Sequence, residues 1–292
     1  MWESYTLIFR VGLYLALSGL VGAAFSLLFS QSALLKNHLS LGFHTHLRPY
    51  FFISLGSVLI TSLGYFWIRV GAFAEEGLSG LFDPLMISIL YDSGLGKALN
   101  YALLTCLFSL LFYRLSHSRY PLWLKCFMFT LMLINISLSF MFTGHTADFT
   151  LVARSVLALH ILIAFLWLGS LYPLWLFVRL EKADMSKQLL ERFGVYASFA
   201  VPVLVLAGVG LIYLISRFEL PLLMSNWGGF LLVKLAMVVG ILGIAAWHKY
   251  KLVPHFLHKK GAEKMASSLK REILIGLSIL TTTGVLSTLV SP

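Results

Sequence analysis

The sequence is divided into long apolar runs separated by short polar stretches, and this feature most constrains the fold. The runs lie at about 5–29, 49–70, 97–115, 121–142, 150–178, 197–216, 229–247 and 272–290. Most approach or exceed the roughly 20 residues that an α-helix needs to cross the hydrocarbon of a bilayer. Lipid offers no partner for backbone polar groups, so each run must be helical. We therefore expect an all-α, polytopic membrane protein with about eight transmembrane helices.

The composition agrees and leaves little room for anything else. Of the 292 residues, 59% are hydrophobic and 12% are charged, which lies far outside the range of soluble globular domains. We expect residues 1–292 to form a single transmembrane domain. The first run follows an acidic rather than a basic start and has no clear small-residue cleavage site, so we expect it to be a mature span, not a secretory signal.

The positive charges predict the orientation. Of the 22 Lys and Arg residues, sixteen lie in the stretches after runs 1, 3, 5 and 7, and four lie in the stretches on the opposite side. The positive-inside rule then places the odd-numbered loops in the cytoplasm and both termini outside. The net charge of +10 reflects this topology and contact with anionic lipid, and we expect no nucleic-acid partner.

Four local patterns carry further predictions. The charged stretch 179–192 has interspersed leucines, which favours a short interfacial helix on the cytoplasmic side. The outer stretch 72–96 is long enough for a short surface helix. Small residues spaced four apart predict close helix contacts, at Gly19 with Ala23 and at Ala236 with Gly240.

Two cations lie inside apolar runs. Arg10 is near the outer end of the first run, where we expect it to extend toward the lipid headgroups. Lys234 lies about six residues into the seventh run from the outer side. It has three interpretations: it extends outward, it pairs with an acid such as Asp148, or it acts as a positive lock against metal leakage.

The nine histidines divide unequally between the two sides. Seven fall in the predicted cytoplasmic loops: His38, His44, His46, His117, His248, His255 and His258. The pairs His44/His46 and His255/His258 have two interpretations, solvated loop residues or receivers of a released ion, and we favour the first. His145 and His160 alone belong to the outer half. His160 lies six residues beyond Arg154, roughly 9 Å along the helix. An ionisable side chain at that depth is a functional candidate.

The chemistry of these two histidines suits copper. Neutral imidazole is a common copper ligand, and a thioether favours Cu(I) over Cu(II). Met141 precedes His145 by one helical turn, so His145, His160 and Met141 are the predicted metal ligands. Two alternatives stay open. His145 can cap the fourth span while His160 bonds a neighbouring helix, or the two rings can be the axial ligands of a b-type haem.

Several short motifs occur in a fixed order from about residue 82 to the end of the chain. They include Gly144-His145, His160, Trp167-Leu168-Gly169, Asn226-Trp227-Gly228-Gly229-Phe230, Lys234, Leu252-Val253-Pro254 and Glu272. This series resembles the bacterial copper-resistance D family, most strongly over residues 82–292. The resemblance implies an inner-membrane protein that moves copper from the periplasm toward the cytoplasm, often beside a periplasmic copper carrier. It also implies that His145 and His160 contact copper.

The mode of transport is limited by what the sequence lacks. It has no Walker-type loop and no Cys-Pro-Cys motif within a span, so we expect neither an ATP-driven pump nor an enzyme. The expected function is copper movement without ATP hydrolysis. The alternatives are a b-type haem cytochrome that uses the same histidines and a copper sensor or scaffold that transports nothing.

Overall fold

The computed structural model describes residues 1–31, 41–142, 150–216 and 219–290, and within these ranges the chain is helical with short turns. The helices are α1 (Trp2–Ser30), α2 (Leu41–Ala74), η1 (Ser79–Phe82), α3 (Pro84–Asp92), α4 (Gly94–Ser116), α5 (Leu122–Met141), α6 (Leu151–Leu180), α7 (Ala183–Ser216), α8 (Leu220–Leu223), α9 (Asn226–Trp247), η3 (His248–Leu252) and α10 (Gly261–Thr288). Here η1 is a 3₁₀-helix and η3 a π-helix. The all-α polytopic prediction is confirmed.

Seven helices in the described ranges are long and apolar enough to cross a membrane: α1, α2, α4, α5, α6, α7 and α9. The eighth predicted span forms as α10, but it begins at Gly261 rather than near residue 272. Its first turns are charged on one face, while Met265 and Leu269 on the other face are buried. The helix continues beyond the apolar run because one face of this amphipathic segment packs against the bundle, although the segment is not apolar throughout.

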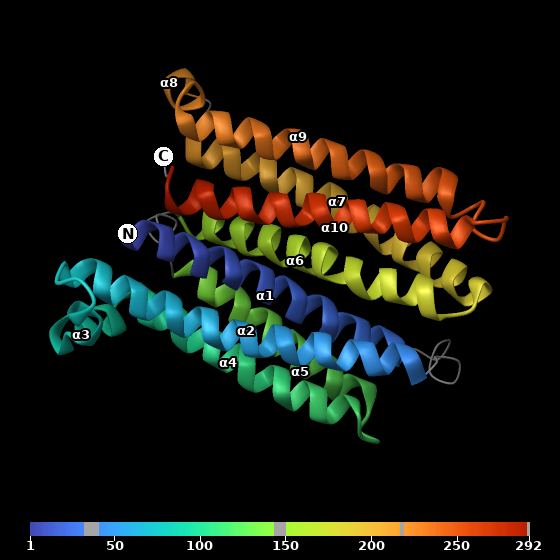
Figure 1. Cartoon of the computed structure of the whole chain (residues 1–292), viewed down its shortest axis with the longest axis horizontal. Coiled ribbons are helices and arrows are strands. Elements are labelled where there is room, and N and C mark those ends of the chain that lie inside the picture. The colour runs from blue at the N-terminus through green and yellow to red at the C-terminus, as the bar shows by residue number, and fades with distance from the viewer. Residues whose placement is uncertain (32–40, 143–149, 217–218, 291–292) are drawn as a thin grey trace.

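Both termini lie at the same end of the bundle, together with α3 and α8 (Figure 1). A chain whose ends meet at one end crosses the bundle an even number of times, so α10 makes the eighth pass. The charge distribution predicts that this end faces outside, so we call it the outer end. The opposite, inner end holds the α6–α7 turn and η3 (Figure 1).

Two connecting segments test the finer predictions. The stretch 179–192 does not form a separate interfacial helix, because α7 runs without interruption from Ala183 to Ser216. Leu189 and Leu190 are buried in the core, so packing holds this segment to the bundle and not to a lipid surface.

The predicted outer surface helix is confirmed as α3, where the Asp83 side chain accepts from the backbone N–H groups of Leu85 (2.8 Å) and Met86 (3.0 Å).

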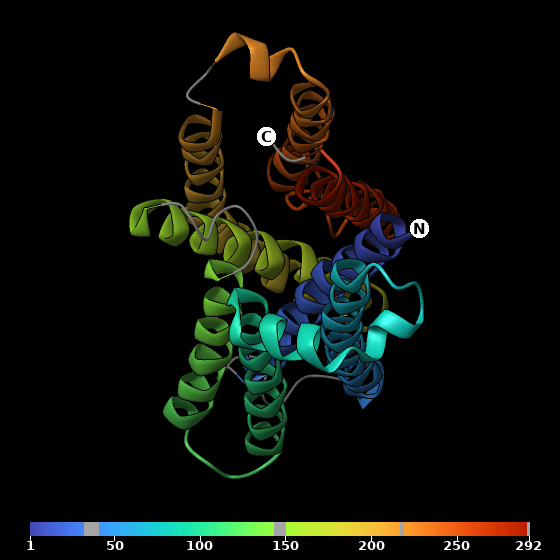
Figure 2. The ribbon, with the colours of Figure 1, turned by 90° about the vertical axis from the view of Figure 1, so that its left-hand side faces the viewer.

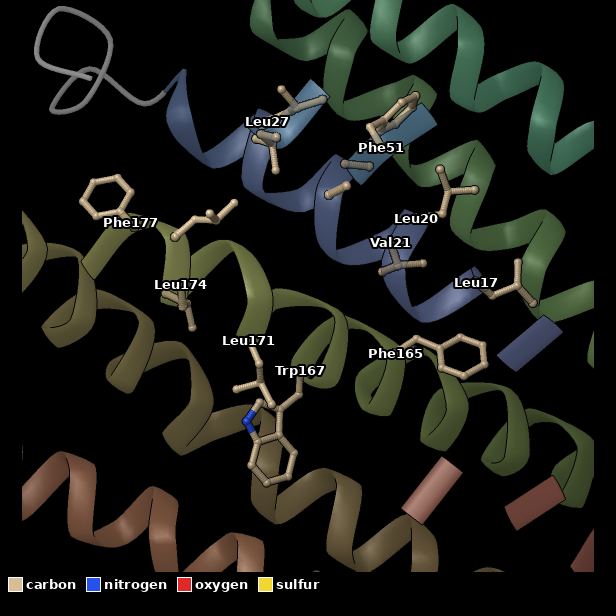
Figure 3. Packing of buried hydrophobic residues seen from close by; sticks show 14 of the residues in the cluster. Leu17, Leu20, Val21, Leu27, Phe51, Phe165, Trp167, Leu171, Leu174 and Phe177 are labelled. Atoms are coloured by element: carbon tan, nitrogen blue, oxygen red, sulfur yellow. The ribbon is translucent and has the colours of Figure 1, made fainter. Parts of the chain in front are cut away.

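The core is centred on α1, which packs against α2, α6 and α10. In the most apolar part of α1, 61% of the residues are buried, against 11% for α7 and for α9. Figure 3 shows Leu17, Leu20 and Val21 of α1 between α6 and the neighbouring helices. At the α1–α6 crossing, a Cβ added to Gly22 or Gly169 would overlap the backbone of the other helix. Glycine at both positions allows the two backbones to meet.

The helices α7 and α9 lie at the periphery. α7 packs against α6, whereas α9 packs against α10, and α8 lies between their outer ends (Figure 2). Their low buried fraction leaves most of their surface for lipid. The helix α7 lies against the part of α6 that carries His160.

Candidate metal site

Two of the three predicted ligands lie at the outer end of α5 and just beyond it. The helix α5 ends at Met141, whose side chain is half-buried. His145 lies outside the described residues. The predicted meeting of His145, Met141 and His160 therefore stays a prediction.

His160 is held on α6 by a hydrogen bond to the neighbouring helix. The Thr150 side chain caps α6 by accepting from the Ala153 N–H at 3.4 Å. Ten residues after this cap, Nδ1 of His160 lies 3.1 Å from the Leu204 carbonyl oxygen of α7. A carbonyl oxygen only accepts, so this bond assigns the proton to Nδ1 and leaves the Nε2 lone pair for a ligand.

A glycine on α7 makes room for the His160 ring. A Cβ added to Gly208 would lie 3.1 Å from His160 Cε1 and 3.5 Å from Nδ1. The ring therefore lies on the α7 side of α6. The α5-facing side is marked by Phe165, whose ring is 5.8 Å from that of Phe140. Residues five apart differ by roughly 140° around a helix, so the imidazole lies on a different face of α6 from the contact with α5.

Lys234 on α9 interacts electrostatically with this imidazole. Both groups lie in the outer half of the bundle. A positive ammonium opposes a cation on Nε2. Asp148, its proposed acidic partner, lies outside the described residues.

A second polar cluster was not predicted from the sequence. His248 was expected in a cytoplasmic loop, but this expectation is wrong: the ring is only 9% exposed, where α9 passes into η3. Its Nε2 lies 2.6 Å from Ser268 Oγ, and its Nδ1 lies 3.4 Å from Glu272 Oε1. The sequence signal was the acid Glu272 at the start of the eighth apolar run.

Other metal-binding chemistry is sparse in the described ranges. They contain no group of three or more His, Cys, Asp or Glu side chains arranged to hold a metal ion. Cys106 is a buried free thiol and Cys126 is a half-buried one. Within the described ranges, His160 therefore belongs to no such group.

The fold and these groups define a multi-pass helical membrane protein with imidazoles held inside its bundle. Residues 187–286 match the sequence family described as copper resistance protein D. The chain is also 31% identical over 137 residues to "Inner membrane protein YebZ" of Escherichia coli (strain K12). The aligned stretch covers 45% of this chain and 47% of the relative. The chain thus spans about half the length of this relative. No solved structure matches the chain.

These matches confirm the resemblance to the copper resistance protein D family and the predicted location in the inner membrane. The family match covers α7, α9 and nearly all of α10. It includes Leu204, Gly208 and Lys234, which surround the His160 ring, but it begins after His160 itself.

Proposed function

We propose that this protein moves copper ions from the periplasm toward the cytoplasm without ATP hydrolysis, through a His/Met site near its outer end. The family match supports a copper-related role, and the geometry of His160 supports the place of the site. Copper is the cargo here, and Cu(I) is favoured over Cu(II). A periplasmic copper carrier is the proposed partner at the outer end.

The observation that carries the proposal is the bond between His160 Nδ1 and the Leu204 carbonyl at 3.1 Å. Metal-binding histidines commonly donate their second ring N–H to a carbonyl or carboxylate, which fixes the tautomer and the ring orientation. Nε2 then offers its lone pair as the first copper ligand. His145 is the second proposed ligand and Met141 the third, giving the low-coordinate, sulfur-containing set that suits Cu(I). Met141 ends α5 whereas the His160 ring faces α7, so a shared ion requires α5 and α6 to shift relative to each other.

Lys234 has a proposed role in release. Its ammonium repels a cation held by His160, so the site binds copper weakly enough to pass it on. A transport site must allow its ion to leave as well as enter. This favours transport over permanent storage at the same imidazole.

Metal analysis of the purified full-length protein tests the site. We expect near-stoichiometric copper after anaerobic loading with Cu(I), and loss of most of it in His160→Ala and in His145→Ala. The matched control is His117→Ala, because His117 Nδ1 also bonds a backbone carbonyl, that of Tyr113 at 3.0 Å, at the inner end of α4. Equal copper in the parent and in both site variants contradicts the assignment.

Two measurements on the same samples separate the alternatives. A sharp Soret band that shifts on reduction with dithionite indicates a b-type haem and contradicts the copper-only site. Copper uptake into proteoliposomes without ATP supports transport. Binding without any uptake indicates a sensor or scaffold.

A further inference from the structure

The inner half of the bundle contains a buried carboxyl–imidazole pair, formed where η3 packs against α10. Glu272 is 2% exposed and His248 is 9% exposed. His248 is held on one side by Ser268, at 2.6 Å from Nε2, and faces Glu272 Oε1 on the other side, at 3.4 Å from Nδ1. Ionisable groups inside a membrane domain are costly and commonly mark ion or proton pathways.

Within the described ranges, no lysine or arginine forms an ion pair with Glu272. Its Oε1 is buried and has no hydrogen-bond partner within the described part of the chain. In the inner half of α1, after Tyr14, there is no ionisable side chain. In α9 there is none after Lys234. On the elements that pack against α10, the other ionisable groups of the inner half are Tyr172 and Arg179 on α6 and Lys249, Tyr250 and Lys251 on η3. The helix α10 itself adds Glu263, Lys264, Lys270 and Arg271.

The contacts of the nearby cations are directed elsewhere. Arg179 and Lys270 both lie over the Trp175 ring, at 5.0 and 5.4 Å from its centroid. Lys249 donates to Ser198 Oγ at 2.6 Å. Among the charged side chains described, His248 alone makes an ion pair with Glu272. The charge of the carboxyl group therefore depends on a proton.

Counting that proton gives the two states of the pair. With one proton added to the carboxylate and neutral imidazole, the pair is neutral overall, either as Glu–COOH with imidazole or as carboxylate with imidazolium. Without that proton the pair carries one negative charge. Burial favours the neutral state, whereas a cation that arrives nearby favours the negative state. One proton leaves as one monovalent cation enters, so charge balances.

The backbone at this point is irregular. Residues His248–Leu252 form a π-helix, and the Val253 N–H donates to the His248 carbonyl at 2.9 Å. Short π-helical segments often occur at functional sites. Here the segment begins at the histidine that faces Glu272.

We propose that His248 and Glu272 form a proton-binding site in the inner half of the membrane domain, which holds one proton when empty of cations and releases it when a monovalent cation enters. Proton binding is independent of the proposed copper function, whereas identification of the cation as Cu(I) rests on it. Ser268 positions the imidazole.

Infrared difference spectroscopy of the purified full-length protein between high and low pH tests the proton site directly. We expect the carbonyl stretch of a protonated, buried carboxyl group in the parent and in the control Glu263→Gln, whose position is exposed on the same helix. The band disappears in the isosteric variant Glu272→Gln and titrates at a changed pH in His248→Asn. A band that Glu272→Gln leaves intact overturns the proposal. Size-exclusion elution at the parent's volume shows that each variant is folded.

A second measurement tests the exchange. At a pH where the band is present, Cu(I) added anaerobically bleaches it in the parent, and proton release appears in weakly buffered solution. A band that Cu(I) leaves unchanged overturns the exchange, even if Glu272→Gln still removes it. Copper binding to the His160 site is measured on the same samples, so loss of the proposed function is distinguished from loss of this coupling.

Discussion

The orientation of the His160 ring depends on Gly208, the glycine of α7 that lies against it. Gly208 leaves the space into which the ring fits, and the Leu204 carbonyl one turn earlier on α7 accepts a hydrogen bond from Nδ1–H of the ring. The imidazole thereby gains a fixed tautomer inside a helix contact. A side chain at position 208 acts on the ring without removing any proposed ligand.

We predict that Gly208→Val weakens Cu(I) binding on the order of 10- to 100-fold while the protein stays folded, because the ring is displaced from the Leu204 carbonyl. Competition with a Cu(I) chelator measures the affinity. Gly194→Val on the same helix is the control, since a Cβ there meets nothing within 4 Å. Equal loss in both variants would point to a general effect on α7.

The contacts of Arg10 differ from the expectation. It does not simply extend toward the headgroups: its guanidinium donates to the Ser287 carbonyl oxygen at 2.6 Å and to the Tyr14 hydroxyl at 3.1 Å. The first and last long helices are therefore joined by a charged group near the outer end. Sequence spacing does not show this, because the two partners are 277 residues apart.

We predict that Arg10→Gln lowers the free energy of unfolding by about 0.5–2 kcal/mol, which spans the values for hydrogen bonds between helices in folded membrane proteins and in model peptides. Thermal unfolding in detergent measures the change. Arg69→Gln is the control, because Arg69 lies over the Phe73 ring of its own helix at 4.9 Å. An unchanged melting temperature for Arg10→Gln would show that the contact adds no net stability.

At the scale of the helix, the packing around each Cα separates two glycines that look alike in the sequence. Gly240 was expected at a close helix contact, but this prediction is wrong, since a Cβ there meets nothing within 4 Å. The expectation for Gly19 is confirmed, because a Cβ there would lie 3.3 Å from the Tyr50 hydroxyl of α2. The tightest crossing, Gly22 with Gly169, joins α1 to α6.

We predict that Gly22→Val lowers the free energy of unfolding by at least about 1–3 kcal/mol, because the added atoms overlap backbone that cannot rotate away. Gly240→Ala is expected to change it by less than about 0.5 kcal/mol or to raise it slightly. Chemical or thermal unfolding of the two variants in the same detergent provides the comparison. Equal stability of both would contradict the close crossing.

The helices were predictable from the sequence to the extent that lipid determines them. Each apolar run became a helix, because no other backbone structure satisfies its polar groups in a bilayer. Where packing decides, the sequence was insufficient: α7 and α10 extend past their apolar runs, and His248 is buried at a predicted loop. The residue types of the candidate site were predictable from the sequence. The contacts of His160 with α7 were not, because they depend on how α7 packs against α6.

At the scale of the whole molecule, the bundle has two ends of different charge and one buried centre. The centre is α1 with α2, α6 and α10, while α7 and α9 remain largely open to lipid. The proposed copper site is nearer the outer end, and the proton site is nearer the inner end. The predicted orientation of the chain determines which compartment each one meets.

Cysteine labelling checks this orientation. In a variant without Cys106 and Cys126, we expect Met224→Cys to react with a membrane-impermeant maleimide added to intact spheroplasts. Tyr120→Cys is expected to react only after the membrane is permeabilised. The parent side chains are exposed, at 86% and 56%, so access to solvent does not limit the reaction. The reverse pattern would invert the topology.

The bond between Arg10 and Ser287 also bears on how the protein is made. A ribosome delivers α1 to the membrane well before α10, so the surface of α1 that packs against α10 has no partner until α10 arrives. During this interval the Arg10 guanidinium must be accommodated by water, headgroups or the insertion machinery. The packed core around α1 is therefore completed only after α10 emerges, and a nascent chain that stalls before α10 is a ready target for membrane quality control.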